Sequence, residues 1–245
     1  MNIKNYKNLK KNKANFDPLT PVDFLKRTAK IFPNYISIIS ENKKFTWGQT
    51  FKRCNLLATA LTKYKIKTGD VVSIMAPNTS AMYEAHFGIP MTGAILNAIN
   101  IRLDAKTISY IIGHSKTKII FVDTEFLPII REALKIKNLK IPIIAIKDDN
   151  KFSRNIKKEI LYEDFLKRGP KKNTMSFKIR DEWSPISLGY TSGTTNKPKG
   201  VVTHHRGAYL NAVSNQLAWN MKKNPTYLWT LPMFHCNGWC FPWTI

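Results

Sequence analysis

The stretch TSGTTNKPKG, residues 191–200, gathers groups that donate hydrogen bonds or carry positive charge. Four of its side chains are hydroxyls, two are lysines, and two glycines free the backbone amides around them. Backbone amides in a glycine-rich turn form a concave nest for anions, and a lysine adds a point charge. The composition therefore predicts a loop that binds a chain of phosphates, because a single carboxylate would need fewer donors.

The spacing of this loop differs from that of the Walker phosphate loop. The Walker pattern is G-x-x-x-x-G-K-[ST], whereas Gly193 and Gly200 lie seven apart here and Val201 follows the second glycine. The alternative interpretation is a solvated Ser/Thr/Gly loop without a ligand. Pro198 stiffens the segment and apolar strands flank it, which favours a binding loop of another class.

The elements that must position this loop alternate between strands and helices. Strands that read as continuous Val/Ile runs are buried on both faces, and βα alternation makes their sheet parallel. We therefore expect an α/β fold with a doubly wound, mostly parallel sheet flanked by helices. The expected strands are residues 35–40, 45–47, 70–77, 94–98, 117–123, 141–147, 185–190 and a last one from residue 226; the expected helices are 21–32, 50–64, 80–94, 104–114, 125–134 and 162–168.

Helix starts can be placed from capping residues. Thr46 with Gln49 makes a capping box ahead of the second helix, and Asn78 or Thr79 can cap the third. Thr20 can cap the first helix, which would begin at Pro21. Three of the tryptophans are assigned to the core: Trp47, Trp183 and Trp229.

The composition of the 245-residue chain limits which classes of partner and which cellular compartment are expected. The 39 basic and 16 acidic residues give a net charge of +23, but the lysines are scattered without a stripe of stacking aromatics, so we expect no nucleic-acid partner. Three cysteines are expected to be reduced thiols without a metal site. No apolar run is long enough for a membrane span, and the basic N-terminus has no apolar core behind it and is not expected to be a secretory signal. A cytoplasmic protein is expected.

The two ends of the chain lead to expectations about domains. Residues 1–16 are polar and lysine-rich and are interpreted as a basic flexible arm, and residues 17–245 as one incomplete domain. At the far end, a free terminus would expose Phe241, Trp243 and Ile245. Exposed apolar surface of this kind indicates a missing partner surface, so the sequence is expected to be truncated.

The loop and four further blocks resemble the AMP-forming adenylating enzymes, the superfamily of acyl-CoA synthetases, luciferases and peptide-synthetase adenylation domains. The blocks occur in order and cover nearly the whole chain after residue 16. HHRGAYLNA and LPMFHCNGWC resemble the branch that acts on short- and medium-chain fatty acids, including the 3-methylthiopropionate CoA ligases. The matching segments are TSGTTNKPKGVV, FTWGQTFKRCNLLATAL, GDVVSIMAPNTSAMYEAHFGIPMTGAILNAINIRLDA, HHRGAYLNA and LWTLPMFHCNGWC.

The resemblance implies an ATP-dependent reaction in two steps. A substrate carboxylate attacks the α-phosphorus of ATP, pyrophosphate leaves, and CoA thiolate then displaces AMP from the acyl adenylate. Preorganised donors stabilise the charge that builds on the phosphate oxygens. The family's glycine after the second threonine is Asn196 here, and asparagine tolerates positive φ better than most residues. The residues assigned to phosphate contact are Thr191, Ser192, Gly193, Thr194, Thr195 and Lys199.

The resemblance also implies an acyl-binding segment. His235, Gly238 and Trp239 would line the acyl pocket, with His235 near the carboxylate and Trp239 along the acyl chain. The alternative for His235 is an ordinary core histidine. His205 and Arg206 are expected to fix the helix that follows the loop, without a chemical role.

Several parts that the resemblance leads one to expect do not occur in these 245 residues. They are an adenine-binding stretch, a magnesium-binding glutamate, a ribose-binding aspartate and a mobile C-terminal lid domain with a catalytic lysine. We therefore assign no catalytic residue or metal ligand, and expect this chain alone to be inactive. The expected ligands are ATP, Mg²⁺, CoA and a carboxylic acid, with a homodimer as a possible state of the full-length enzyme. The alternatives are a stand-alone ATP- or anion-binding remnant and a basic nucleic-acid-binding protein.

Overall fold

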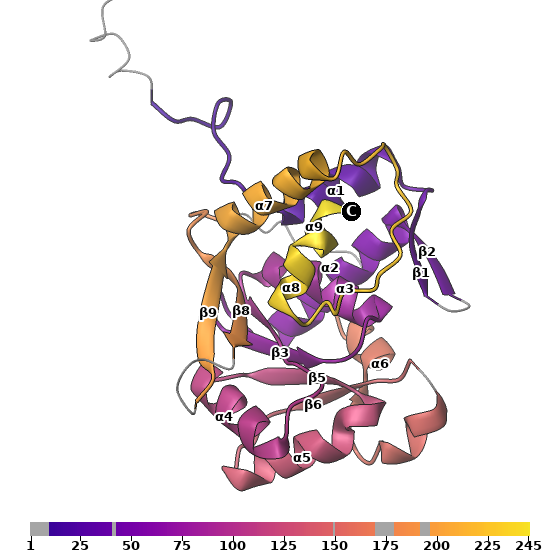
Figure 1. The fold of residues 1–245 in the computed structure, drawn as a ribbon, viewed down its shortest axis with the longest axis vertical. Helices are drawn as coiled ribbons and strands as arrows, with labels where there is room; N and C mark the ends of the chain where they lie inside the picture. The colour runs from indigo at the N-terminus through magenta and orange to yellow at the C-terminus, as the bar shows by residue number, and fades with distance from the viewer. Residues whose placement is uncertain (1–9, 41–42, 149, 170–178, 192–196) are drawn as a thin grey trace, which may run out of the picture.

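The computed structural model describes residues 10–40, 43–148, 150–169, 179–191 and 197–245 as an α/β fold (Figure 1). The strands are β1 Ile36–Ser40, β2 Lys43–Thr46, β3 Val71–Met75, β4 Ile95–Ala98, β5 Ile119–Asp123, β6 Ile143–Ile146, β7 Ile160–Leu161, β8 Pro185–Thr191 and β9 Lys199–His204. The helices are α1 Val22–Ile31, α2 Trp47–Lys63, α3 Ser80–Gly88, α4 Ala105–Ser115, α5 Leu127–Ile136, α6 Tyr162–Leu166, α7 His205–Ala218, α8 Cys236–Trp239 and α9 Phe241–Thr244, with short 3₁₀ turns at Pro90–Thr92, Thr124–Phe126 and Asn150–Asn155.

Seven strands form one sheet in the order β7-β6-β5-β3-β4-β8-β9, and β1 and β2 form a separate antiparallel hairpin. Every pairing in the large sheet is parallel except that of β8 with β9. The chain leaves β3 toward β4 and then returns to the other side of β3 with β5, which is the doubly wound arrangement. The predicted fold class is confirmed.

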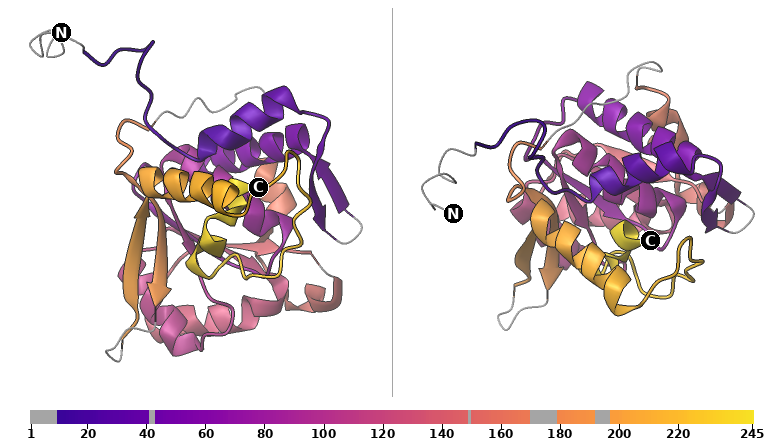
Figure 2. Two further views of the ribbon diagram at one scale, coloured as in Figure 1. Left: turned by 45° about the horizontal axis from the view of Figure 1, so that its top comes forward. Right: turned by 90° about the horizontal axis from the view of Figure 1, so that it is seen from above.

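Helices cover both faces of this sheet, as the alternation of elements requires (Figures 1 and 2). One core cluster includes Leu57 of α2 and Phe87 of α3. The other includes Ile108 of α4 and Ile130 of α5. The five residues of β3 are all buried, as are those of β5. Continuous apolar strands are thus sandwiched between helices, which is why they show no alternation of polar residues.

The capping residues mostly act as predicted. The Thr46–Gln49 capping box is present at the start of α2, and the Thr79 side chain accepts a hydrogen bond from the Met82 amide at the start of α3. α3 ends earlier than expected, at Gly88, because Pro90 lacks the amide that would continue the helix. The Thr20 hydroxyl accepts from the Val22 amide at 3.3 Å at the start of the first helix, and Pro21 has helical dihedrals, although α1 itself begins one residue later than expected, at Val22.

A buried ion pair joins three helices beside the sheet. The Glu84 side chain on α3 is fully buried, and the Arg53 guanidinium on α2 donates to it at 2.5 Å. The Tyr162 hydroxyl, at the start of α6, donates to the other Glu84 oxygen at 2.7 Å. Burial raises the pKa of the Glu84 carboxyl, and the Arg53 charge opposes that rise. The network ties α2, α3 and α6 into one unit.

Two expectations about the end of the chain are wrong. Residues 225–230 form no strand. Phe241 and Trp243 are only 5% and 2% exposed, because α9 packs on α3 and α7 and the Trp243 indole donates to the His86 carbonyl at 2.9 Å. Ile245 is half-buried. The terminal aromatics therefore belong to the core and do not form exposed surface.

Two smaller points concern the surface. Trp183, which was assigned to the core, is 66% exposed and lies against the His204 ring.

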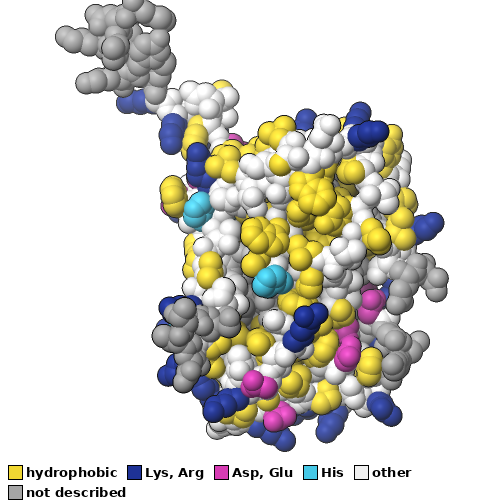
Figure 3. All heavy atoms as spheres, viewed as in Figure 1, with side chains coloured by type: hydrophobic (Ala, Val, Ile, Leu, Met, Phe, Trp, Pro, Cys, Tyr) yellow, Lys and Arg dark blue, Asp and Glu magenta, His cyan; other side chains and the backbone are white. Residues whose placement is uncertain are grey.

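Figure 3 shows hydrophobic side chains gathered in the middle of one face and Lys and Arg side chains mostly around its edge. Over the described ranges, the longest helices are too short or too polar to span a bilayer.

Candidate functional site

The predicted phosphate loop connects β8 to β9. Thr191 ends β8 and Lys199 begins β9, and the two residues are cross-strand partners. Both are exposed, so their hydroxyl and ammonium groups face solvent at the end of the hairpin. The other residues assigned to phosphate contact, Ser192, Gly193, Thr194 and Thr195, lie outside the described residues, as does Asn196.

The residue before the loop is held from the side by α4. Tyr190 is the neighbour of Thr191, and its hydroxyl lies 2.7 Å from the His114 Nδ1 atom. His114 stacks on Tyr110 one helical turn earlier, and the Lys137 ammonium lies over the Tyr110 ring. Burial raises the pKa of Tyr190 to about 12. These contacts fix the end of β8, and sequence reasoning missed them because they join residues far apart in the chain.

The loop leaves the sheet at its carboxyl edge. β3, β4 and β8 are parallel, so the segments that follow them emerge on the same side. After β3, the Asn78 side chain donates to the Leu231 carbonyl at 3.0 Å and accepts from the Met233 amide at 2.8 Å. Asn78, considered in the sequence as a helix cap, thus holds the segment that leads to the predicted acyl-binding residues.

Two of the predicted acyl-binding residues, Gly238 and Trp239, lie on a turn of left-handed backbone, and the third, His235, directly precedes it. Five consecutive residues, 236–240, have φ between 49° and 66°, and α8 comprises most of them. The left-handed conformation costs roughly 1–2 kcal/mol for each residue that is not glycine. Gly238 lies in the middle, and a Cβ there would approach Trp229 Cζ2 to 3.0 Å. His235 and Trp239 are both exposed, with Trp239 58% exposed, so His235 is no core histidine.

A buried hydrogen bond links this turn to the strand of the phosphate loop. Asn237 Nδ2 donates to Ser187 Oγ at 2.7 Å. Ser187 lies on β8, four residues before Thr191, which is about 13 Å along an extended strand. The structure therefore connects the two predicted halves of the site through one polar pair. An Asn-Gly dipeptide marks turns in sequence, so Asn237–Gly238 carried a signal for this feature.

His205 and Arg206 have the structural roles that were expected of them. The Thr20 hydroxyl lies 2.9 Å from His205 Nδ1, and Arg206 donates to the Glu182 carboxylate at 2.6 Å. The same carboxylate accepts from the Leu19 amide at 2.8 Å. The start of α7 is thus joined to the segment before α1.

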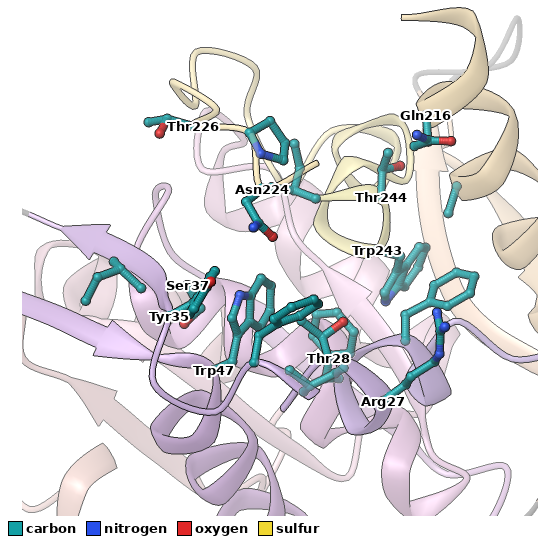
Figure 4. Close-up of a pocket in the computed structure, with 18 of the residues that line it drawn as sticks. Arg27, Thr28, Tyr35, Ser37, Trp47, Gln216, Asn224, Thr226, Trp243 and Thr244 are labelled. Atoms are coloured by element: carbon teal, nitrogen blue, oxygen red, sulfur yellow. The ribbon is translucent and has the colours of Figure 1, made fainter. Parts of the chain in front are cut away.

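A cavity of about 480 Å³ lies apart from these residues, between α1, β1 and the end of α9 (Figure 4). Trp47 and Trp243 are among its apolar lining residues, and the polar side chains of Arg27 and Gln216 line it as well. Of the described residues of the predicted site, neither Thr191 and Lys199 nor His235 and Trp239 line it. Its volume suits a small ligand, but it does not coincide with the site that the sequence predicts.

The described residues were also compared with the ligand groups that hold metal ions in proteins. Within the ranges that the structure describes, no three His, Cys, Asp or Glu side chains gather in a group suited to a metal. Mg²⁺ prefers carboxylates together with substrate phosphates.

A comparison with protein families matches residues 25–245 to the AMP-binding enzymes. The chain belongs to this family.

Among curated proteins, the chain is 50% identical over 240 residues to the peroxisomal butyrate–CoA ligase of Arabidopsis thaliana, covering 95% of this chain and 42% of that protein. It is 50% identical over 238 residues to the peroxisomal benzoate–CoA ligase of the same plant, covering 94% of this chain and 41% of the relative. The chain thus spans about two fifths of the length of these relatives and is homologous to acyl-CoA ligases.

The fold matches solved structures of the same class. An anthranilate CoA ligase in complex with anthranoyl-AMP superposes with a TM-score of 0.78 over 96% of this chain and 45% of that chain, at 22% identity. At that identity the likeness establishes the fold alone, the α/β fold of the N-terminal part of adenylate-forming enzymes.

Proposed function

We propose that this chain supplies the phosphate-binding and acyl-binding part of an AMP-forming acyl-CoA ligase. The observation that carries the proposal is the link between the two predicted halves of the site. Thr191 and Lys199 are partners at the carboxyl end of β8, and Ser187 on the same strand holds Asn237 between the two acyl-binding residues His235 and Trp239.

In the proposed reaction, one carboxylate oxygen of the acid attacks the α-phosphorus of ATP. The bond from that phosphorus to its bridging oxygen breaks, and pyrophosphate leaves. CoA thiolate then attacks the acyl carbon, and the bond to AMP breaks. The donors of residues 191–199 stabilise charge on the phosphates, which needs no proton transfer from the protein. Mg²⁺, when bound to the nucleotide, would neutralise phosphate charge.

The proposed substrates are short-chain acids and compact aromatic acids. The relatives at 50% identity are named for butyrate and benzoate, and HHRGAYLNA and LPMFHCNGWC resemble ligases of short- and medium-chain fatty acids and of 3-methylthiopropionate. We propose residues 17–245 as the partial nucleotide-binding domain and residues 1–16 as a separate basic arm. A cytoplasmic location stays a prediction that a fluorescent fusion would test, since these relatives are named as peroxisomal.

The test is acid-dependent release of pyrophosphate from ATP, measured with butyrate, hexanoate, benzoate and 3-methylthiopropionate. The 245-residue chain is compared with a chimera that continues it with the C-terminal part of the Arabidopsis butyrate–CoA ligase. We expect ATP binding in both proteins but pyrophosphate release only in the chimera, because the chain alone does not orient the α-phosphorus.

Two results would contradict the proposal. A chain that binds neither ATP nor pyrophosphate would rule out the phosphate loop. If the chain binds ATP but the chimera releases no pyrophosphate with any of the acids, the alternative of an anion-binding protein without catalysis is favoured.

A further inference from the structure

The left-handed turn at residues 236–240 needs a physical reason. Four of its five residues are not glycine, and all five have φ between 49° and 66°. A run of this kind persists only where the surroundings over-determine it, and such positions concentrate at functional sites. The turn carries Trp239, and His235 directly precedes it, so the strained backbone coincides with the predicted acyl-binding segment.

Polar contacts hold the turn from two sides. On the sheet side, Asn237 Nδ2 donates to Ser187 Oγ at 2.7 Å, and Asn237 and Ser187 are 8% and 0% exposed. On the α7 side, Asn215 Nδ2 donates to the Trp239 carbonyl at 2.8 Å and Asn211 Nδ2 donates to it at 3.3 Å. The turn is therefore anchored to β8 by the Asn237 side chain and to α7 through the Trp239 carbonyl, in addition to its own backbone hydrogen bonds from Gly238 to His235 and from Cys240 to Asn237.

Asn237 suits its place for two separate reasons. Asparagine adopts the left-handed region more readily than other residues that carry a Cβ. Its amide also supplies the donor that the buried Ser187 hydroxyl accepts, and a buried polar group left without its partner is costly. Glycine would keep the backbone conformation but lose the hydrogen bond, whereas a β-branched residue would lose both.

We propose that Asn237 is a positioning residue for the acyl-binding segment. Its amide holds the left-handed turn on Ser187, the strand residue that also leads into the phosphate loop. His235 and Trp239 are exposed, so the conformation of this backbone decides where their side chains stand relative to the loop. The predicted acyl-binding segment and the predicted phosphate loop are thus both attached to the same strand, β8. The choice of ligands rests on the proposed function. The claim that the Asn237–Ser187 bond sets the conformation of the turn, called the geometric part below, does not.

The geometric part is tested on the chain itself, labelled with 5-fluorotryptophan. The six tryptophans give separate ¹⁹F resonances, and Trp239→Phe identifies that of Trp239. We expect Asn237→Gly and Ser187→Ala to shift or broaden the Trp239 resonance, and the double variant to resemble either single one, because both remove the same bond. The resonance of Trp243, which is 2% exposed, reports whether each variant is folded.

The matched control is Asn220→Gly. Asn220 also has a positive φ, 46°, but it is exposed and follows α7. This substitution should leave the Trp239 resonance unchanged. If Asn237→Gly and Ser187→Ala leave it unchanged as well, the inference is overturned.

The functional part is tested with two probes on the same variants, butyrate and inorganic pyrophosphate, by calorimetric titration. Loss of the Asn237–Ser187 bond should weaken butyrate binding at least tenfold and leave pyrophosphate binding within twofold. Equal butyrate affinity in wild type and both variants would overturn the positioning role. A wild-type chain that binds neither probe would overturn the proposed function, and the Trp239 resonance would still decide whether Asn237 sets the turn.

Discussion

Lys199 is the cation that the β8–β9 register places opposite Thr191. A hydrogen bond to a charged group contributes about 1.5–3 kcal/mol, so Lys199→Ala should weaken pyrophosphate or ATP binding about 10- to 100-fold. Titration calorimetry of the chain checks this.

The control for Lys199 is Lys30→Ala. Lys30 is an exposed lysine in the last turn of α1, so its loss changes net charge by the same amount without touching the loop. If both variants lose affinity equally, the effect is one of overall charge and Lys199 is no phosphate ligand.

Two buried histidines make stability depend on pH. Burial lowers the pKa of His86 to about 4, and burial followed by the His204 charge lowers the pKa of His205 to about 4. The unfolded chain binds protons below about pH 6.5, whereas the folded chain does not until about pH 4. Stability therefore falls as pH decreases through this window, by roughly 2 kcal/mol for each histidine between pH 7 and pH 5.

Urea unfolding at pH 7 and pH 5 measures this loss. In His86→Asn the amide can still donate to the Met82 carbonyl that His86 Nδ1 contacts at 2.8 Å, but the titrating group is gone. The variant should lose less stability than wild type over the same interval. An unchanged loss would show that His86 does not contribute.

Single residues also mark the limit of what the sequence could predict about the site. The loop composition predicted that Thr191 and Lys199 contact the same phosphate chain, and the β8–β9 register makes them cross-strand partners. The strand β9 that creates this pairing was not among the expected strands. Ser187 and Asn237 were missed because the hydrogen bond between them joins residues 50 positions apart. Neither residue type is unusual by itself, and only the fold brings them together.

At the scale of elements, the Arg53–Glu84 pair joins α2 to α3. Removing one partner of a buried ion pair leaves an uncompensated charge and costs about 3–5 kcal/mol, so Arg53→Met should destabilise the chain by that amount. Replacing both residues, as in Arg53→Met with Glu84→Leu, should recover most of the loss, because no buried charge remains.

Denaturant unfolding distinguishes these variants. Lys167→Met is the matched control, since Lys167 pairs with Asp164 at 2.8 Å where both side chains are exposed. That change should cost under about 1 kcal/mol. If the double variant is as unstable as Arg53→Met, the ion pair is not what holds α2 against α3.

Elements were predictable where local signals agree with the fold. The capping box at Thr46 and the apolar runs of β3 and β5 are signals of that kind. The aromatic segment at residues 225–230 looked like a strand because aromatic and β-branched residues favour strands, but it has no strand pairing, and Asn78 holds the residues that follow it, Leu231 and Met233. The left-handed turn at 236–240 could not be predicted, because contacts with β8 and α7 override the local preference.

At the scale of the whole molecule, one edge of the large sheet carries no further strand among the described residues. β9 lies at the edge of the sheet, and its Val201 and Val202 are 52% and 58% exposed. Unprotected edges pair with other chains, so the chain should self-associate at high concentration. Val202→Lys should shift the mass measured by light scattering toward the monomer, whereas Lys44→Ala on β2 should not. Equal self-association of Val202→Lys and wild type would rule out this edge.

The register of the β8–β9 hairpin has a consequence for the position of the Lys199 charge. Side chains on a strand alternate between its two faces, so slipping β9 by one residue would send Lys199 to the opposite face from the one it now shares with Thr191. A one-residue change in the β8–β9 register would therefore have to be compensated by a bulge for the Lys199 side chain to stay on the face that it shares with Thr191. The pairing register of β8 with β9 thus determines the face of the sheet on which the Lys199 charge lies.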